Sequence, residues 1–194
     1  MIMNKDYWSS RYKKQQTGWD IGEASRPLIH LFETIENKNL KILIPGCGNA
    51  YEADYLYHIG FRNVFIMDIA LEPLNEFRLR NRTFPESHIL QEDFFKHQGK
   101  YDLIVEQTFF CAISPELRQS YVEKCFELLK DGGKLIGVLF DREFEGGPPF
   151  GGNKNEYLRL FKTHFEEVLI QNCYHSIKPR AGSEIIITCD KAIS

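Results

Sequence analysis

Short apolar runs alternate along this chain with segments in which apolar side chains recur at helical spacing. Five runs are rich in β-branched or aromatic residues and stop at glycine, proline or polar residues, which is typical of buried parallel strands: 40–44, 63–67, 87–90, 101–105 and 134–140. Helical spacing, proline starts and glycine stops predict helices at 26–35, 49–60, 72–82, 114–130 and 155–161. Two more strand-like runs, 165–174 and 184–190, follow one another with only a turn between them.

This order of elements predicts an α/β fold. Strands that alternate with helices form a parallel, doubly wound sheet with helices on both faces, and two consecutive strands add an antiparallel hairpin. We therefore expect a Rossmann-like, seven-stranded sheet, mostly parallel, that ends in an antiparallel C-terminal hairpin. The 194 residues suit one domain spanning 1–194.

The stretch from residue 40 to residue 68 reads as strand, glycine turn, helix, strand and acid. Gly46 and Gly48 let the backbone turn tightly and approach a ligand. Asn49 is expected to cap the following helix. Asp68 stands at a distance from the turn that suits a carboxylate binding ribose hydroxyls. Tyr51 replaces the third glycine of the dinucleotide fingerprint, so the pattern predicts a nucleoside-containing ligand, and a βαβ unit without a ligand is the alternative.

Ligands of such sheets bind outside the carboxyl ends of the strands. Six residues with suitable chemistry fall at or just past predicted strand ends, and we expect one crevice to collect them: Gly46, Asp68, Asp93, Glu106, Phe109 and Asp141.

The N-terminal 24 residues form an unusually aromatic segment. Trp8 and Tyr12 are four residues apart and share a face if this part is helical. Trp19 follows after a break at Thr17 and Gly18. The aromatic side chains either dock the segment on the core or form a lid over a ligand.

Composition and charge argue against nucleic-acid binding, membrane insertion, secretion and zinc binding. A net charge of −3 argues against general nucleic-acid binding. No apolar run is long enough to span a membrane, and the N-terminus is too polar for a secretory signal. Five scattered cysteines suggest reduced thiols, and the dispersed histidines lack zinc-ligand spacing. We therefore expect a cytoplasmic monomer that acts on a small molecule, without metal, membrane or nucleic acid.

Several motifs occur together in this chain: Trp8-x3-Tyr12-x4-Thr17-Gly18-Trp19-Asp20, residues 44–48 (IPGCG), Met67-Asp68-Ile69, residues 92–95 (EDFF), 109–113 (FFCAI) and 147–150 (GPPF). In this order they resemble the thiopurine, thiol and halide methyltransferase family, within the class I S-adenosylmethionine-dependent methyltransferases. The chain departs from that family at two places. Tyr12 stands where many members carry tryptophan, and Glu106-Gln107 stands where members carry Asp-Tyr or Asp-Arg.

The resemblance implies that S-adenosylmethionine is the cofactor and that eight residues touch it: Trp8, Tyr12, Trp19, Gly46, Asp68, Asp93, Phe94 and Gln107. We add Gly48, whose backbone would approach the amino-acid portion, and Ile69, which could pack on the adenine face.

Methyl transfer from a sulfonium needs an acceptor that is held in line and kept dry. We expect Phe109, Phe110, Pro149 and Phe150 to form the acceptor pocket. Arg142 or Arg180 could lower the pKa of the acceptor by its charge, and a surface position is the alternative for each. Glu106 and Asp141 are candidate general bases, although a thiol with its ordinary pKa near 8.5 is already a few per cent ionised at neutral pH. The predicted reaction is methyl transfer to a small soft nucleophile, such as a thiol, a thiopurine-like compound or a halide.

Two other functions compete with this prediction. A nicotinamide-dependent oxidoreductase uses the same strand–turn–helix unit, but the missing third glycine, the terminal hairpin and the lack of a substrate domain oppose it. A non-catalytic S-adenosylmethionine-binding module would keep the fold without turnover, and the departure at Glu106-Gln107 leaves that open. Cys111 could be a nucleophile, but core packing suits it better.

Overall fold

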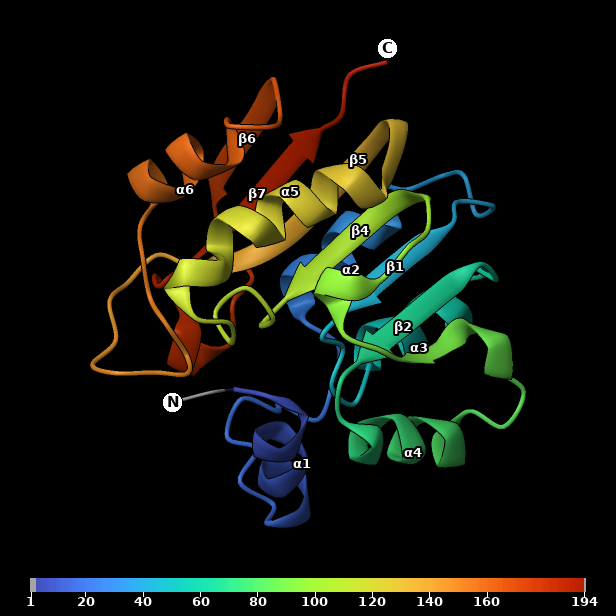
Figure 1. Cartoon of the computed structure of the whole chain (residues 1–194). Coiled ribbons are helices and arrows are strands. Elements are labelled where there is room, and N and C mark those ends of the chain that lie inside the picture. The colour runs from blue at the N-terminus through green and yellow to red at the C-terminus, as the bar shows by residue number, and fades with distance from the viewer. Residues whose placement is uncertain (1–2, 194) are drawn as a thin grey trace.

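Seven strands form one sheet in the computed structural model, which describes residues 3–193. Their order is β3-β2-β1-β4-β5-β7-β6 (Figure 1). The first five strands pair in parallel, whereas β7 is antiparallel to both β5 and β6. The strands are β1 (Ile42–Pro45), β2 (Val64–Asp68), β3 (Ile89–Gln91), β4 (Tyr101–Gln107), β5 (Leu129–Phe140), β6 (Glu167–Asn172) and β7 (Glu184–Asp190). The predicted fold class is confirmed, including the C-terminal hairpin.

Six α-helices accompany the sheet: α1 (Lys5–Lys13), α2 (Arg26–Glu33), α3 (Tyr51–His58), α4 (Leu71–Arg80), α5 (Arg118–Leu128) and α6 (Lys154–Phe161). Alternate residues of the central strands face opposite sides. In β4, Leu103 and Val105 pack with side chains of α2, α3 and α4. Ile104 between them packs with side chains of α5 and α6. The sheet therefore carries helices on both faces.

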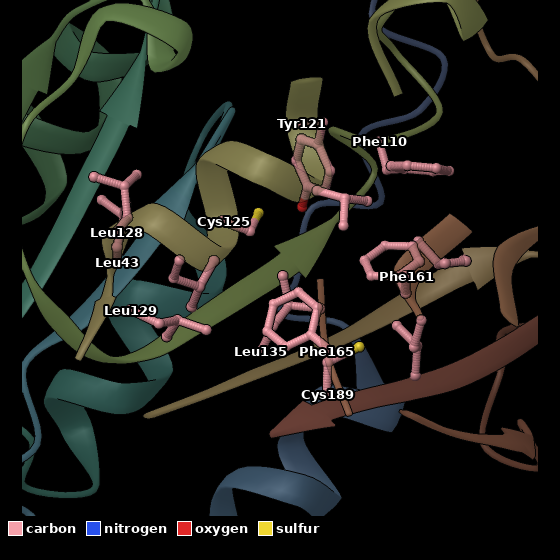
Figure 2. Packing of buried hydrophobic residues seen from close by; sticks show 14 of the residues in the cluster. Leu43, Phe110, Tyr121, Cys125, Leu128, Leu129, Leu135, Phe161, Phe165 and Cys189 are labelled. Atoms are coloured by element: carbon pink, nitrogen blue, oxygen red, sulfur yellow. The ribbon is translucent and has the colours of Figure 1, made fainter. Parts of the chain in front are cut away.

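Aromatic rings dominate the core between the sheet and α5 and α6. Figure 2 shows Phe110, Tyr121 and Phe161 in this cluster. The ring centroid of Phe110 lies 5.2 Å from that of Tyr121 and 5.7 Å from that of Phe161. Rings that pack this closely fix the height of α5 and α6 above the sheet.

The chain crosses from one half of the sheet to the other between β3 and β4. The strands β1, β2 and β3 run outward in one direction, and β4 then returns to lie beside β1. This reversal is the topological switch point, where doubly wound sheets bind their ligands. The helix α1 lies at this end, beyond the arrowheads of β1, β2 and β4 and next to α4 (Figure 1).

Two sequence-based expectations about helix ends are wrong. The residue before α3 is Ala50 in a left-handed conformation, and Asn49 does not cap the helix, because its side-chain amide donates to Asp20 instead. The helix predicted to run to Lys130 ends at Leu128 and begins with a 3-10 turn, Pro115–Leu117. It stops early because Leu129 already pairs with Tyr101 as the first residue of β5.

None of the helices within residues 3–193 is long and apolar enough to cross a membrane. In the same range, no three His, Cys, Asp or Glu side chains gather as a metal-binding group. The predicted domain includes Met1, Ile2 and Ser194, which lie outside the described residues.

Candidate active site

A cavity of about 800 Å³ opens at the carboxyl ends of the parallel strands, a size typical of small-molecule sites. Segments far apart in the sequence line it: α1 and the residues after it, the ends of β1 to β5, and the loops near residues 148 and 180. Thirteen of the predicted site residues line this one cavity: Trp8, Tyr12, Trp19, Gly46, Gly48, Asp68, Ile69, Asp93, Phe94, Gln107, Phe109, Pro149 and Arg180.

The glycine turn after β1 fits closely against two aromatic side chains. Gly46 and Gly48 have φ angles of +57° and +52°, in the left-handed region that glycine tolerates best. A Cβ atom at Gly46 would overlap the Phe109 ring, and one at Gly48 would lie 2.9 Å from the Tyr12 hydroxyl. The turn therefore needs glycine both for its backbone angles and for these contacts.

Asp68 at the end of β2 is buried and accepts two backbone hydrogen bonds. Its Oδ2 accepts the Gly48 N–H at 2.9 Å, and its Oδ1 accepts the Ala70 N–H at 2.8 Å. A carboxylate offers about four acceptor positions, so about two remain for a ligand. Burial raises the pKa of Asp68 to about 6. Hydrogen bonds donated by a ligand would favour its ionised form.

The aromatic N-terminal segment is held against the body of the protein on several sides. The Trp19 ring lies edge-on to the rings of Trp8 and Tyr12, with centroids 5.5 and 5.8 Å away. Arg180 donates to the Trp19 carbonyl oxygen at 2.8 Å, and Lys13 lies 3.2 Å from Glu72 of α4. The three rings also line the cavity, so this segment is both docked and in contact with the site.

Glu106 lies beside the site but does not line the cavity. Its Oε1 accepts the N–H groups of Phe109 and Phe110 at 2.9 Å each, and its Oε2 accepts the hydroxyl of Tyr121. Burial raises its pKa to about 7. Thr108, two residues further on, has a φ of +58°, which is rare for a β-branched residue. Glu106 thus holds the turn that carries Phe109 into the cavity.

Three other predicted residues also lie outside the cavity lining. Phe110 is in the aromatic core below α5. The Phe150 ring packs against Gly147, and its N–H donates to the Cys111 carbonyl oxygen. Asp141 accepts the N–H of Lys154 at 3.1 Å at the start of α6. We expected these three residues at the acceptor pocket, but their side chains do not line the cavity. Residues at strand ends and in loops can point to either side, and the sequence does not show which side.

Cys111 lines the cavity as a protonated thiol. It is buried, and its Sγ donates to the Thr108 carbonyl oxygen at 3.3 Å. Burial raises its pKa to about 12. A thiol in this state is a poor nucleophile, so the packing role is the better interpretation.

The chain also matches known proteins over most of its length. The sequence model described as thiopurine S-methyltransferase (TPMT) matches residues 3–188. A probable thiol methyltransferase 2 of Arabidopsis thaliana is 33% identical over 184 residues, which cover 91% of this chain and 81% of that protein. Thiocyanate methyltransferase 1 of the same plant is 29% identical over the same shares of the two chains.

Among solved structures, 1,6-didemethyltoxoflavin-N1-methyltransferase of Burkholderia thailandensis is similar in fold. Its TM-score is 0.76 at 18% sequence identity, over 97% of this chain and 87% of that one. The chain belongs to the thiopurine S-methyltransferase family.

As a member of the thiopurine S-methyltransferase family, the protein is an enzyme that uses S-adenosylmethionine. The residues present fit this cofactor. Asp68 retains acceptor capacity for two ribose hydroxyls, and the aromatic rings suit the positively charged sulfur. The Oε1 atom of Gln107 is buried and has no hydrogen-bond partner within residues 3–193, as expected for an atom that awaits a ligand.

Sequence reasoning missed several residues of the cavity in this thiopurine S-methyltransferase family member. Arg11 lines it, as do Asp20, Asn49 and Phe140. Arg11 could have been found, because it lies three residues after Trp8 and so on a neighbouring part of the same helix face. Asn49 was predicted to cap a helix. Its actual hydrogen bond to Asp20 joins residues 29 positions apart, which no local pattern reveals.

Proposed function

We propose that this methyltransferase acts on a small, soft nucleophile, with a thiolate as the preferred acceptor. The observation that carries the proposal is the composition of the cavity wall near the ends of β4 and β5. Phe109, Phe140, Pro148 and Pro149 line it, and Arg180 adds a positive charge. The two carboxylates considered as bases, Glu106 and Asp141, are engaged in backbone hydrogen bonds outside the lining.

A soft acceptor needs little help from a base. A thiol is partly ionised at neutral pH, whereas a hydroxyl or an ammonium group would need a base to remove its proton. The relatives in this family are named for thiols and thiocyanate, which are acceptors of this soft class, and this supports the same assignment here.

The cofactor supplies a methyl group on a positively charged sulfur and leaves as a neutral thioether. Asp68 and the glycine turn hold the nucleoside and amino-acid portions. The rings of Trp8, Tyr12 and Trp19 stabilise the positive charge by roughly 0.5–2 kcal/mol and exclude water. We assign residues 3–24 the role of a lid over this end of the cavity.

Arg180 is placed to favour an anionic acceptor. Its guanidinium is mostly buried, donates to the Trp19 carbonyl oxygen and lies 3.5 Å from Glu184. A guanidinium has five N–H donors, so others remain for a thiolate. Its positive charge favours the ionised sulfur and so increases the fraction that can attack the methyl carbon.

The test is a methyl-transfer screen read as S-adenosylhomocysteine. The screen compares thiophenol with phenol, which differ in the accepting atom, and includes a thiopurine and iodide as further soft acceptors. We expect turnover with thiophenol and little with phenol. Equal rates with both would contradict the soft-acceptor assignment.

A variant test addresses the charge. Arg180→Met should raise the KM for a thiol and move the pH profile of kcat/KM to higher pH, because the thiol would ionise less in the site. Arg142→Met is the matched control, since Arg142 also lines the cavity but is exposed.

A further inference from the structure

Arg11 lines the cavity, and within residues 3–193 its side chain has neither an ion-pair nor a hydrogen-bond partner. It stands on α1 and lines the cavity, with the carbon of its guanidinium 5.6 Å from the centroid of the Trp19 ring. Its Nε is buried and has no hydrogen-bond partner, and its side chain forms no ion pair with another residue between positions 3 and 193. A buried donor without a partner is costly, so its place in a binding cavity points to a ligand atom.

Gln107 is a second residue of the cavity lining with an unpaired polar atom, and it stands at the end of β4. Its buried Oε1 is an acceptor without a donor. Two other buried polar atoms of the described residues share this lack of a partner, Glu72 Oε2 and Arg118 Nε, but those residues do not line the cavity. Among the described residues, the cavity lining thus offers one buried cationic donor and one buried acceptor without a hydrogen-bond partner.

The order of the strands indicates which part of a bound nucleoside ligand lies near Gln107 and Arg11. Asp93 follows β3, Asp68 ends β2, the glycine turn follows β1, and Gln107 ends β4. A ligand whose ribose is held by Asp68 and whose adenine lies toward Asp93 has its other end beside the glycine turn and Gln107.

Arg11 belongs to this same end. The Trp19 ring beside its guanidinium also contacts the Tyr12 ring, and the Tyr12 hydroxyl lies 2.9 Å from the place that a Cβ atom on Gly48 would take. Arg180, by contrast, lies on the β7 side and has partners in Trp19 and Glu184.

We propose that Arg11 binds the α-carboxylate and Gln107 the α-ammonium group of the amino-acid portion of S-adenosylmethionine. The guanidinium fork matches a carboxylate in charge and geometry, and an ammonium group donates to a carbonyl oxygen. The cation–π contact with Trp19 helps to hold the guanidinium in place. The inference rests on S-adenosylmethionine as the methyl donor and is independent of the acceptor.

The test is calorimetric binding of two ligands that share the nucleoside. S-adenosylhomocysteine carries the amino-acid portion, and 5′-methylthioadenosine lacks it. Arg11→Met should weaken S-adenosylhomocysteine about 10- to 100-fold, the range for one charge-assisted hydrogen-bonded pair. Binding of 5′-methylthioadenosine should change less than about twofold, since that ligand has no carboxylate to lose. Lys14→Met, which removes an exposed positive charge beside the same helix, is the matched control and should leave both affinities unchanged.

A second variant tests the other half of the site. Gln107→Met keeps the length of the side chain and removes its acceptor oxygen. A third ligand, the desamino analogue of S-adenosylhomocysteine, keeps the carboxylate and lacks the amino group. Gln107→Met should weaken S-adenosylhomocysteine but not the desamino analogue, whereas Arg11→Met should weaken both, because both carry the carboxylate.

Three results would overturn the proposal. If Arg11→Met bound S-adenosylhomocysteine as tightly as the wild type, Arg11 would not contact the cofactor carboxylate and would instead face the acceptor. Equal weakening of both nucleosides by Arg11→Met, or no recovery of S-adenosylhomocysteine affinity in Arg11→Lys, would show that Arg11 acts only through the packing of α1. If the wild-type protein bound neither nucleoside, the methyl-donor assignment itself would fail, which is a separate outcome.

Discussion

Asp68 makes cofactor binding depend on pH. Its pKa is about 6 because burial opposes its charge, yet ribose hydroxyls need an ionised acceptor. Binding therefore favours the deprotonated form, and affinity should be constant above about pH 7. Below about pH 6 it should fall roughly tenfold per pH unit, as a proton must leave before the ligand binds. Calorimetric titration of S-adenosylhomocysteine between pH 5 and 8 measures this.

Asp68→Asn is the matched control for that titration. The amide has similar shape but presents one donor group, so we expect affinity at least about tenfold lower at pH 7 and nearly independent of pH. The same pH profile in both proteins would mean that Asp68 does not carry the ribose.

Glu106 should make stability depend on pH. Its pKa is 4.5 without burial and about 7 in the folded protein, since burial disfavours the charge. The folded state therefore binds a proton that the unfolded state has lost, and the free energy of unfolding decreases as pH rises from about 4.5 to about 7. The loss should be on the order of 2 to 3 kcal/mol.

Glu106→Gln removes this contribution, so the difference between the two proteins isolates it. Urea denaturation at pH 5, 6, 7 and 8 is the measurement. Neighbouring Tyr121, Cys111 and Cys125 all have raised pKa values and stay protonated in this window. A wild-type curve parallel to that of Glu106→Gln would contradict the prediction.

At the scale of elements, sequence periodicity predicted every strand and, with explicit bounds, every α-helix except α1, because the spacing of apolar residues follows the buried face of each element. Element ends were less predictable. The end of α5 depends on pairing between Leu129 and Tyr101, which are 28 positions apart. The side chain of Glu106 points toward Tyr121 of α5. That direction depends on which face of β4 is covered by α5, and local spacing does not show this.

The same limit applies to the site. The residues on the strand ends and in the aromatic segment were found from motifs and a family resemblance. Arg11 was not. Its position three residues after Trp8 was the available signal, but a charged residue on a short polar helix has the same local pattern as a solvated surface residue.

Arg118 connects α5 with α6 and with the loop before α6, and its role can be tested by substitution. Its side chain is 5% exposed, lies 2.8 Å from Glu156 of α6 and donates to the Gly151 carbonyl oxygen at 2.7 Å. Arg118→Met leaves these groups without their donor, and should lower the free energy of unfolding by about 2 to 4 kcal/mol. Because the loop before Gly151 carries Pro148 and Pro149, the KM for the acceptor should also rise.

Two comparisons define this effect of Arg118. Binding of S-adenosylhomocysteine should stay within about twofold, since the cofactor end does not include this loop. Arg159→Met on the exposed face of α6 is the matched control and should cost less than about 0.5 kcal/mol. Loss of cofactor affinity equal to the loss for the acceptor would show that Arg118 supports the whole cavity.

The whole molecule brings the α1 segment, the ends of β1 to β5 and the loops near residues 148 and 180 together around one cavity. The α1 segment is short and polar, and its fixed points are the pair of Lys13 with Glu72, the bond of Asn49 to Asp20 and the bond of Arg180 to Trp19. An exposed salt bridge contributes only about 0–1 kcal/mol, so local opening of this segment should cost far less than global unfolding. A ligand that contacts Trp8, Tyr12 and Trp19 would add to these few attachments.

Limited proteolysis with trypsin tests that coupling. Saturating S-adenosylhomocysteine should slow cleavage after Lys13 and Lys14, because the closed segment is stabilised by RT ln(1 + [L]/Kd), about 2.7 kcal/mol at 100 times Kd. That corresponds to a rate lowered up to about 100-fold where cleavage needs local opening. Exposed Lys162 at the end of α6 lies away from the cavity lining and serves as the control within the same chain. Equal protection at both places would indicate global stabilisation alone, and the lid assignment would then fail.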